Sequence, residues 1–399
     1  MTEERPVLRE IAWQEIFPGI LLLSAWKVAI GFRLITLGAA GALVTWLGWV
    51  LIDRTLGISE QDSLAFTWFS PMGTRLPNGG VTHWWFASPI VEAWADLSRP
   101  FVQAFSPEID AWRFLYLALC GFWALAVWAF FGGAITRMAT VQLTRDERIS
   151  WGQAFAFARS KWLAYMAAPL FPMFGVLLAT LPLALIGLIS RAGGFGMVVT
   201  GLLWPVVLFI GFVMAVLLVG LFLNWPLMWP TISTEGTDSF DALSRSYAYS
   251  FQRPLRYAAY LFLVAAIGVL GWLLVTFFAA SIRDLSTWGV KWGSGVDLDE
   301  ALNGRIALEG MQGFGRDLIF WGNRAVGLIV VGFLFSYFFV SSTAVYLMLR
   351  YHVDATETDE VYLTDENDPR SLPPLATDAA GVAKVADAGA AGSPNSPEG

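Results

Sequence analysis

The sequence has few charged residues and almost no cysteine or histidine. Only 14% of its 399 residues are charged, against about a quarter in a typical soluble domain. One Cys and two His are too few for a disulfide scaffold or a Cys/His zinc site. The low charge, with 56% hydrophobic residues, also excludes a disordered chain. The composition therefore predicts an all-α polytopic membrane protein.

Negative charge is concentrated at the C-terminal end. Residues 354–399 hold ten acidic and two basic residues, so the rest of the chain is close to neutral. From Ser371 onward this tail is rich in Pro, Ala, Gly and Ser and has no aromatic residue. Such a composition buries too little surface to offset the entropy of ordering the chain. We expect 354–399 to be a disordered acidic tail, which either aids solubility or docks a partner protein.

Six apolar stretches are long enough to cross a membrane, which takes about 20 helical residues. They cover residues 34–52, 114–135, 162–189, 197–223, 257–280 and 319–349. The middles of the first five hold no ionisable residue, which argues against an ion-coupled pump. In the sixth, we expect Arg324 to reach the outer surface or to pair with Asp317.

Basic residues predict the orientation of the spans. They are dense in the two short connections that follow the second and fourth spans: Arg137, Arg145, Arg148, Arg159 and Lys161, then Arg245, Arg253 and Arg256. Both termini should therefore be cytoplasmic, in the inner membrane of a bacterial cell. Residues 1–33 form a predicted cytoplasmic segment with an interfacial helix, and residues 34–353 form the membrane domain.

The two basic connections resemble each other. Ser150 and Gln153 fit a capping box, and Asp238 can cap a second helix. The second segment has an apolar stripe at helical spacing, made of Phe240, Leu243, Tyr247, Phe251 and Leu255. Such a helix lies in the headgroup plane with its apolar face in the lipid.

Three tandem modules are the simplest architecture, each an inner amphipathic helix followed by two spans. They would cover residues 11–136, 137–232 and 233–352, with 11–33 as the helix of the first. The alternative is that membrane-flanking segments simply share this composition.

These segments carry a family resemblance. Ser150-Trp151-Gly152-Gln153 and Asp238-Ser239-Phe240-Asp241 each precede an apolar hairpin, and Ala344–Arg350 with Val353-Asp354 ends the last span. Residues 137–354 thereby resemble the membrane domain of bacterial glycerophosphodiester phosphodiesterases and related six-span bacterial proteins. In those enzymes the chemistry belongs to a separate soluble barrel. This sequence has no room for one, so the resemblance implies no catalytic residue.

The sequence holds no recognisable catalytic motif. His83 and His352 fall on opposite sides of the membrane in this topology, and HExxH, CxxC, Walker and GxSxG patterns are all missing. His83, beside two Trp residues, is either an interfacial polar residue or the centre of an outer-face site. We expect no enzymatic activity, no cofactor or metal, and no nucleic-acid partner.

Two sets of residues are candidates for function. The first consists of inner-face bases that suit lipid headgroups or the membrane interface: Arg159, Lys161, Arg245, Arg253 and Arg256. The second consists of residues for a hinge or gate: Pro169, Pro172, Pro182, Asn224, Pro226 and Pro230. We expect the last two prolines to break the fourth span and free carbonyls, one of which Asn224 could bond. Alternatively, these residues only stop or fit helices.

Residues 90–105 form one more amphipathic segment, on the outer side. Its charges at Glu92, Asp96 and Arg99 argue against a seventh span. We expect it to lie on the outer leaflet or to cap the bundle.

Three functions remain open at this stage. The first is a non-catalytic scaffold or partner subunit, which binds membrane lipids and docks another protein through the acidic tail. The second is a permease or lipid-handling protein, and the third is a membrane enzyme with a site near His83.

Overall fold

The computed structural model describes residues 19–69, 89–106, 109–293 and 310–363, and the backbone of 376–377 and 383–384. The helices are α2 (Ile20–Ala29), α3 (Phe32–Leu56), α4 (Leu64–Phe69), α5 (Pro89–Ala104), α6 (Ala111–Arg145), α7 (Trp151–Ser160), α8 (Trp162–Ile189), α9 (Gly193–Glu235), α10 (Ser239–Gln252), α11 (Pro254–Lys291) and α13 (Gly310–Asp354).

The chain divides into two units, residues 1–361 and 362–399. In the second, β1 (Ala376–Thr377) pairs antiparallel with β2 (Ala383–Lys384). Most of the acidic tail lies outside the described residues, so its disorder stays a prediction.

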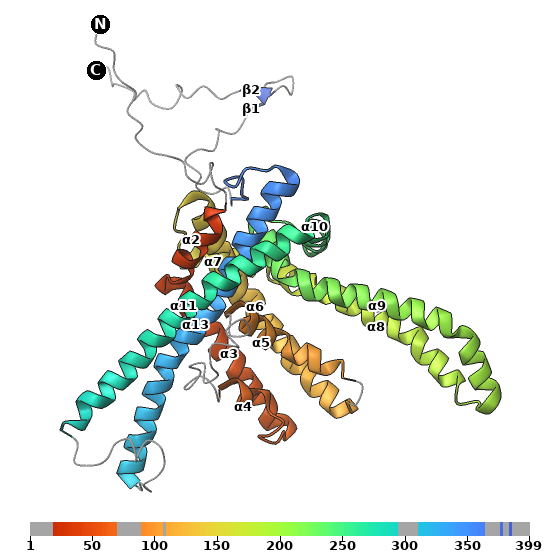
Figure 1. Cartoon of the computed structure of the whole chain (residues 1–399), viewed down its shortest axis with the longest axis horizontal. Coiled ribbons are helices and arrows are strands. Elements are labelled where there is room, and N and C mark those ends of the chain that lie inside the picture. The colour runs from red at the N-terminus through yellow and green to blue at the C-terminus, as the bar shows by residue number, and fades with distance from the viewer. Residues whose placement is uncertain are drawn as a thin grey trace, which may run out of the picture. The chain divides into compact units, whose positions relative to one another are not determined.

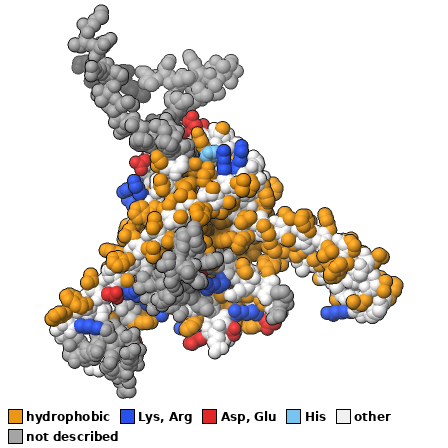
Figure 2. Space-filling model, viewed as in Figure 1, with side chains coloured by type: hydrophobic (Ala, Val, Ile, Leu, Met, Phe, Trp, Pro, Cys, Tyr) orange, Lys and Arg blue, Asp and Glu red, His pale blue; other side chains and the backbone are white. Residues whose placement is uncertain are grey.

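Six helices of the first unit are long and apolar enough to cross a membrane: α3, α6, α8, α9, α11 and α13. Hydrophobic side chains cover the long helices on the face shown in Figure 2, and the charged side chains gather toward the helix ends. The chain is therefore an all-α, multi-pass integral membrane protein, as the composition predicts. Most of the helices run past the predicted spans, because polar residues at their ends continue the helical hydrogen bonding.

The long helices form groups that diverge from a shared end (Figure 1). The pair α8 and α9, the pair α11 and α13, and the group of α3, α5 and α6 separate from one another away from α2, α7 and α10. At the shared end α13 is buried without interruption from Gly332 to Arg350. By contrast, most of the apolar surface of α8 and α9 is exposed. The fold thus has a well-packed shared end, which we call the hub. The less packed parts of the long helices that diverge from it are the arms.

The short helices α7 and α10 begin as predicted. Ser150 and Gln153 form the complete capping box of α7, and the Asp238 carboxylate accepts hydrogen bonds from two backbone N–H groups of α10. On α10, Phe240 and Phe251 are exposed, as is Leu255 near the start of α11, while Tyr249 is buried against the protein. The other two residues of the predicted stripe, Leu243 and Tyr247, pack against the core. Only the ends of the stripe therefore face away from the protein, as residues of a helix in the membrane surface should. The chain order, α7 before α8–α9 and α10 before α11–α13, is the order of the module hypothesis, which stays a prediction.

Helix α5 does not cap the bundle, so the expectation that it would do so is wrong. A Cβ atom on Gly268, midway along α11, would touch the rings of Pro89 and Tyr337. The start of α5 therefore lies beside the middle of α11 and α13. On its other side, α5 packs on α6, where the Phe101 ring covers Gly121. The buried residues along α5 explain this position, because they include the small side chain of Ala93.

Two glycines bring α3 and α13 into backbone contact. A Cβ atom on Gly38 would lie 2.4 Å from the carbonyl oxygen of Gly332, and a Cβ atom on Gly332 would lie 2.4 Å from that of Ile35. Small residues allow such close approach, and packing of this kind drives helix association in lipid. The contact sits near the start of α3 and fixes it to the hub.

We expect Gly38→Ala to destabilise the protein by about 1–3 kcal/mol, the usual range for overpacking a tight contact. Gly201→Ala is the matched control, because that glycine lies on α9 with open space around it. Thermal unfolding in mild detergent measures both. Equal unfolding temperatures for the two variants would show that α3 and α13 are not in backbone contact.

Candidate functional site

A half-buried carboxylate joins three helices at the hub. Glu235, the last residue of α9, accepts from Arg350 Nε of α13 at 2.6 Å and from the Tyr346 hydroxyl at 3.1 Å. Arg245 Nη1 of α10 lies 3.8 Å from its other oxygen. The side chains of Glu235 and Arg350 are only 15% and 8% exposed, so little water screens the pair. The carboxylate holds the ends of α9, α10 and α13 together.

A second buried cation, Arg137, faces the turn of α9 that precedes Glu235. Arg137 Nη1 of α6 donates to the carbonyl of Ser233 at 2.8 Å, and its guanidinium stacks 4.3 Å from the ring centre of Phe157 in α7. The Ser233 hydroxyl is 2.6 Å from the hydroxyl of Thr136 and 2.7 Å from that of Tyr165. These contacts join α6, α7 and α8 to α9. The prediction that Arg137 lies in a connecting loop is wrong, because α6 continues to Arg145.

Two of the five candidate bases meet at the C-terminal end of α9. The Lys161 ammonium donates to the carbonyls of Gly236 and Thr237. Gly236 caps the helix with φ +65°, in the left-handed region where glycine is favoured. A cation there also complements the negative end of the helix dipole. The second base, Arg245, pairs with Asp241 in α10 at 3.0 Å and faces Glu235.

The hydroxyl of Tyr249 adds a further contact between α10 and α13. It donates to the carboxylate of Asp354, the last residue of α13. Burial raises the pKa of Tyr249, and the neighbouring carboxylate raises that pKa further. The phenol is therefore a neutral donor at physiological pH.

The other three candidate bases remain at the surface. Arg159 lies in the last turn of α7, and Arg253 and Arg256 flank the junction between α10 and α11, all exposed. The exposed apolar side chain of Leu255 lies between the last two in sequence. The structure thus separates the predicted set into two partly exposed bases that contact the end of α9 and three that are exposed.

The hinge candidates lie within continuous helices. Helix α9 continues through Pro226 and Pro230, so the predicted break is wrong. Asn224 is buried, and its side-chain amide donates to the carbonyl of Gly220 at 2.8 Å. That carbonyl is not one that proline frees, because Pro226 and Pro230 free the carbonyls four residues before them.

In α8, each proline has a different environment. Pro169 removes the hydrogen bond that the carbonyl of Tyr165 would accept, and Trp229 Nε1 donates to that carbonyl at 2.9 Å instead. Pro172 is buried, whereas Pro182 is exposed. The indole of Trp229 therefore compensates for a proline on the neighbouring helix.

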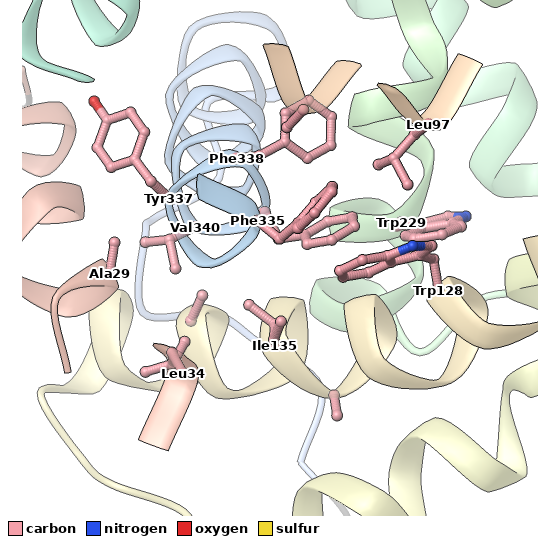
Figure 3. Close-up of a cluster of buried hydrophobic side chains, with 14 of the residues drawn as sticks. Ala29, Leu34, Leu97, Trp128, Ile135, Trp229, Phe335, Tyr337, Phe338 and Val340 are labelled. Carbon is pink, nitrogen blue, oxygen red and sulfur yellow. The ribbon is translucent and has the colours of Figure 1, made fainter. Parts of the chain in front are cut away.

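An apolar cavity of about 440 Å³ lies where the arms begin to diverge. Four helices contribute to its wall: Leu97, Ser98, Phe101 and Val102 of α5, with Phe105 just after it; Ala124, Leu125 and Trp128 of α6; Pro169 and Met173 of α8; Leu218, Val219, Leu221, Phe222, Trp225 and Trp229 of α9. We call this cavity the slot. Figure 3 shows Leu97, Trp128 and Trp229 approaching one another from three of these helices.

The groups described so far provide ionic, hydrogen-bond and apolar contacts. Among the described residues, no group of three or more His, Cys, Asp or Glu could hold a metal ion. His83 lies outside the described residues. His352 contacts the carbonyl of Met348 at 2.8 Å and the hydroxyl of Tyr260 at 3.3 Å. In the sixth span, Asp317 pairs with its neighbour Arg316, and Arg324 stacks on the ring of Phe320.

The sequence alone predicted neither the slot nor the charges packed within the hub. Glu235 and Arg350 lie at the ends of apolar stretches, where hydropathy alone places a solvated loop. A signal for the buried packing was available in the pair Gly132-Gly133 within a span. The rings of Trp229 and Tyr165 occupy the space that side chains at these two glycines would fill.

No protein-family model matches the chain, and neither a curated protein nor a solved structure does. The resemblance to the phosphodiesterase membrane domain stays a prediction.

We expect Glu235→Gln to lower the stability of the protein by about 3 kcal/mol, because it leaves Arg350 buried without its counter-ion. The matched control is Asp317→Asn, which removes a more exposed pair and should cost about 1 kcal/mol or less. Unfolding in detergent gives both values. If the two variants lose the same stability, Glu235 does not join the helices at the hub.

Proposed function

We propose that this protein is a lipid-handling integral membrane protein that binds a membrane lipid between its helical arms. The observation that carries the proposal is the slot. Its volume falls within the range of about 300–1,000 Å³ typical of small-molecule sites. Its wall is almost entirely apolar and is built from helices whose outer faces suit lipid.

Hydrocarbon is the expected content of such a cavity. The wall residues gain dispersion energy only if atoms fill the space beside them. An apolar cavity offers water few hydrogen-bond partners, so water does not fill it favourably. The acyl chains that surround the spans are the abundant apolar molecules at this depth.

Exposed arginines next to an apolar helix face support a second contact with lipid, at the surface of the hub and separate from the lipid in the slot. Arg253 and Arg256 are exposed where α10 meets α11, beside the exposed stripe residues Phe251 and Leu255. This pairing suits a helix that rests on the lipid surface with its bases among anionic headgroups.

The other functions have less support. A scaffold that docks a partner through the acidic tail depends on residues that lie mostly outside the described ones. An enzyme centred on His83 depends on a residue that also lies outside them. Both stay predictions.

We expect Ala124→Phe to remove most of the lipid that the purified protein retains, because Ala124 lines the slot and a phenyl ring would occupy it. The matched control is Ala118→Phe, an exposed position on the same helix that does not line the slot. Native mass spectrometry in mild detergent counts the lipids bound to each protein. Equal retention by wild type and Ala124→Phe, with both folded, would contradict the proposal.

We expect the double variant Arg253→Gln and Arg256→Gln to lose selectivity for anionic lipid. Each arginine near an anionic surface contributes about 1 kcal/mol, so the pair should change the binding of phosphatidylglycerol by about 10- to 30-fold. Phosphatidylglycerol and phosphatidylcholine are compared in the same mixed micelles. The control is Arg191→Gln, which removes an exposed base just after the C-terminal end of α8. An unchanged lipid ratio in the double variant would remove these arginines from headgroup binding.

A further inference from the structure

The slot has a closed end and an open end. Leu97, Trp128 and Trp229, toward the hub, are 8%, 1% and 2% exposed. Val102 and Val219 line the same slot and are 59% and 58% exposed. The slot is therefore closed toward the hub and opens sideways between the arms.

The slot is elongated along α9. Its wall on that helix extends from Leu218 to Trp229, which is about 17 Å at 1.5 Å per residue. An extended hydrocarbon chain matches both this length and the apolar character of the wall.

The closed end offers a ligand no hydrogen bond. Trp229 Nε1 is committed to the carbonyl of Tyr165, and the Ser98 hydroxyl donates to the carbonyl of Trp94 at 2.7 Å. Trp128 Nε1 has no acceptor among the described residues, but it is buried beneath the wall and out of reach of a ligand. An ester or a headgroup at this end would lose its hydrogen bonds to water and find no replacement, which is unfavourable.

From this geometry we infer the ligand class and its direction of binding. The slot holds one acyl chain of a membrane glycerolipid, with the terminal methyl group against Trp128 and Trp229. The ester and headgroup stay outside, beyond the mouth at Val102 and Val219. The length of the slot then sets the length of chain that can be enclosed. The inference rests on the proposed function, because it requires that the slot bind lipid at all.

Photolabelling with two lipids tests the direction. Both are phosphatidylglycerols with a diazirine on one acyl chain, placed near the methyl end in the first lipid and near the ester in the second. After irradiation of the full-length protein in mixed micelles, we expect the first lipid to label the residues around Trp128 and Trp229. The second should label the residues around Val102 and Val219.

The possible outcomes separate the two proposals. Labelling in the reverse order, or the same pattern with both lipids, overturns the methyl-first inference and leaves lipid binding in place. No labelling of the slot by either lipid overturns the proposed function as well.

A variant at the mouth gives a second test that does not disturb the core. Val102 is exposed, so Val102→Trp should fold normally while narrowing the opening. We expect it to reduce labelling at the closed end several-fold. Leu115→Trp, an exposed position on α6 outside the slot, should leave labelling unchanged. Full labelling at Trp128 in Val102→Trp would show that a chain does not enter through this mouth.

Discussion

The neutralisation of Glu235 is the interaction on which the arrangement of the arms depends. The long helices diverge, so they support one another mainly near their shared end. There the carboxylate meets cations from two different helices, and the backbone just before it accepts from a third cation on α6. A charge with so little exposure to solvent is tolerated only when its partners are present. The hub is therefore specific: α9 must meet α13 and α10 for Glu235 to face its cations, and α6 for Arg137 to find its acceptor.

Lipid imposes a related constraint on the backbone. A carbonyl left without its helical partner at membrane depth finds no water, so a protein group must bond to it. The bond from Trp229 to the carbonyl of Tyr165 meets this need at Pro169. Because of it, a proline in α8 becomes a reason for α8 and α9 to stay together. The same ring stacks on Phe339 of α13, with centroids 5.4 Å apart.

Much of the fold could be predicted from the sequence, and the sites could not. The centres of the six spans are evident because lipid requires long apolar helices, and the caps at Ser150 and Asp238 depend only on local sequence. The ends of the spans were misjudged because hydropathy treats Arg137 as solvated, whereas it is buried against Ser233 and Phe157. Such pairing joins residues far apart in the chain. The slot is also a product of tertiary structure, because its wall combines four helices that no periodicity relates. The position of α5 was missed for the same reason.

The side chain of Trp229 belongs to both regions of the molecule. One part of its ring forms the closed end of the slot, and its nitrogen holds Tyr165, whose hydroxyl reaches Ser233, which in turn binds Arg137. A molecule in the slot that displaced this indole would release the carbonyl of a residue two contacts away from the buried Arg137. Binding in the slot would then be linked to the charges of the hub, and such linkage is reciprocal. A change at those charges would in turn alter binding in the slot.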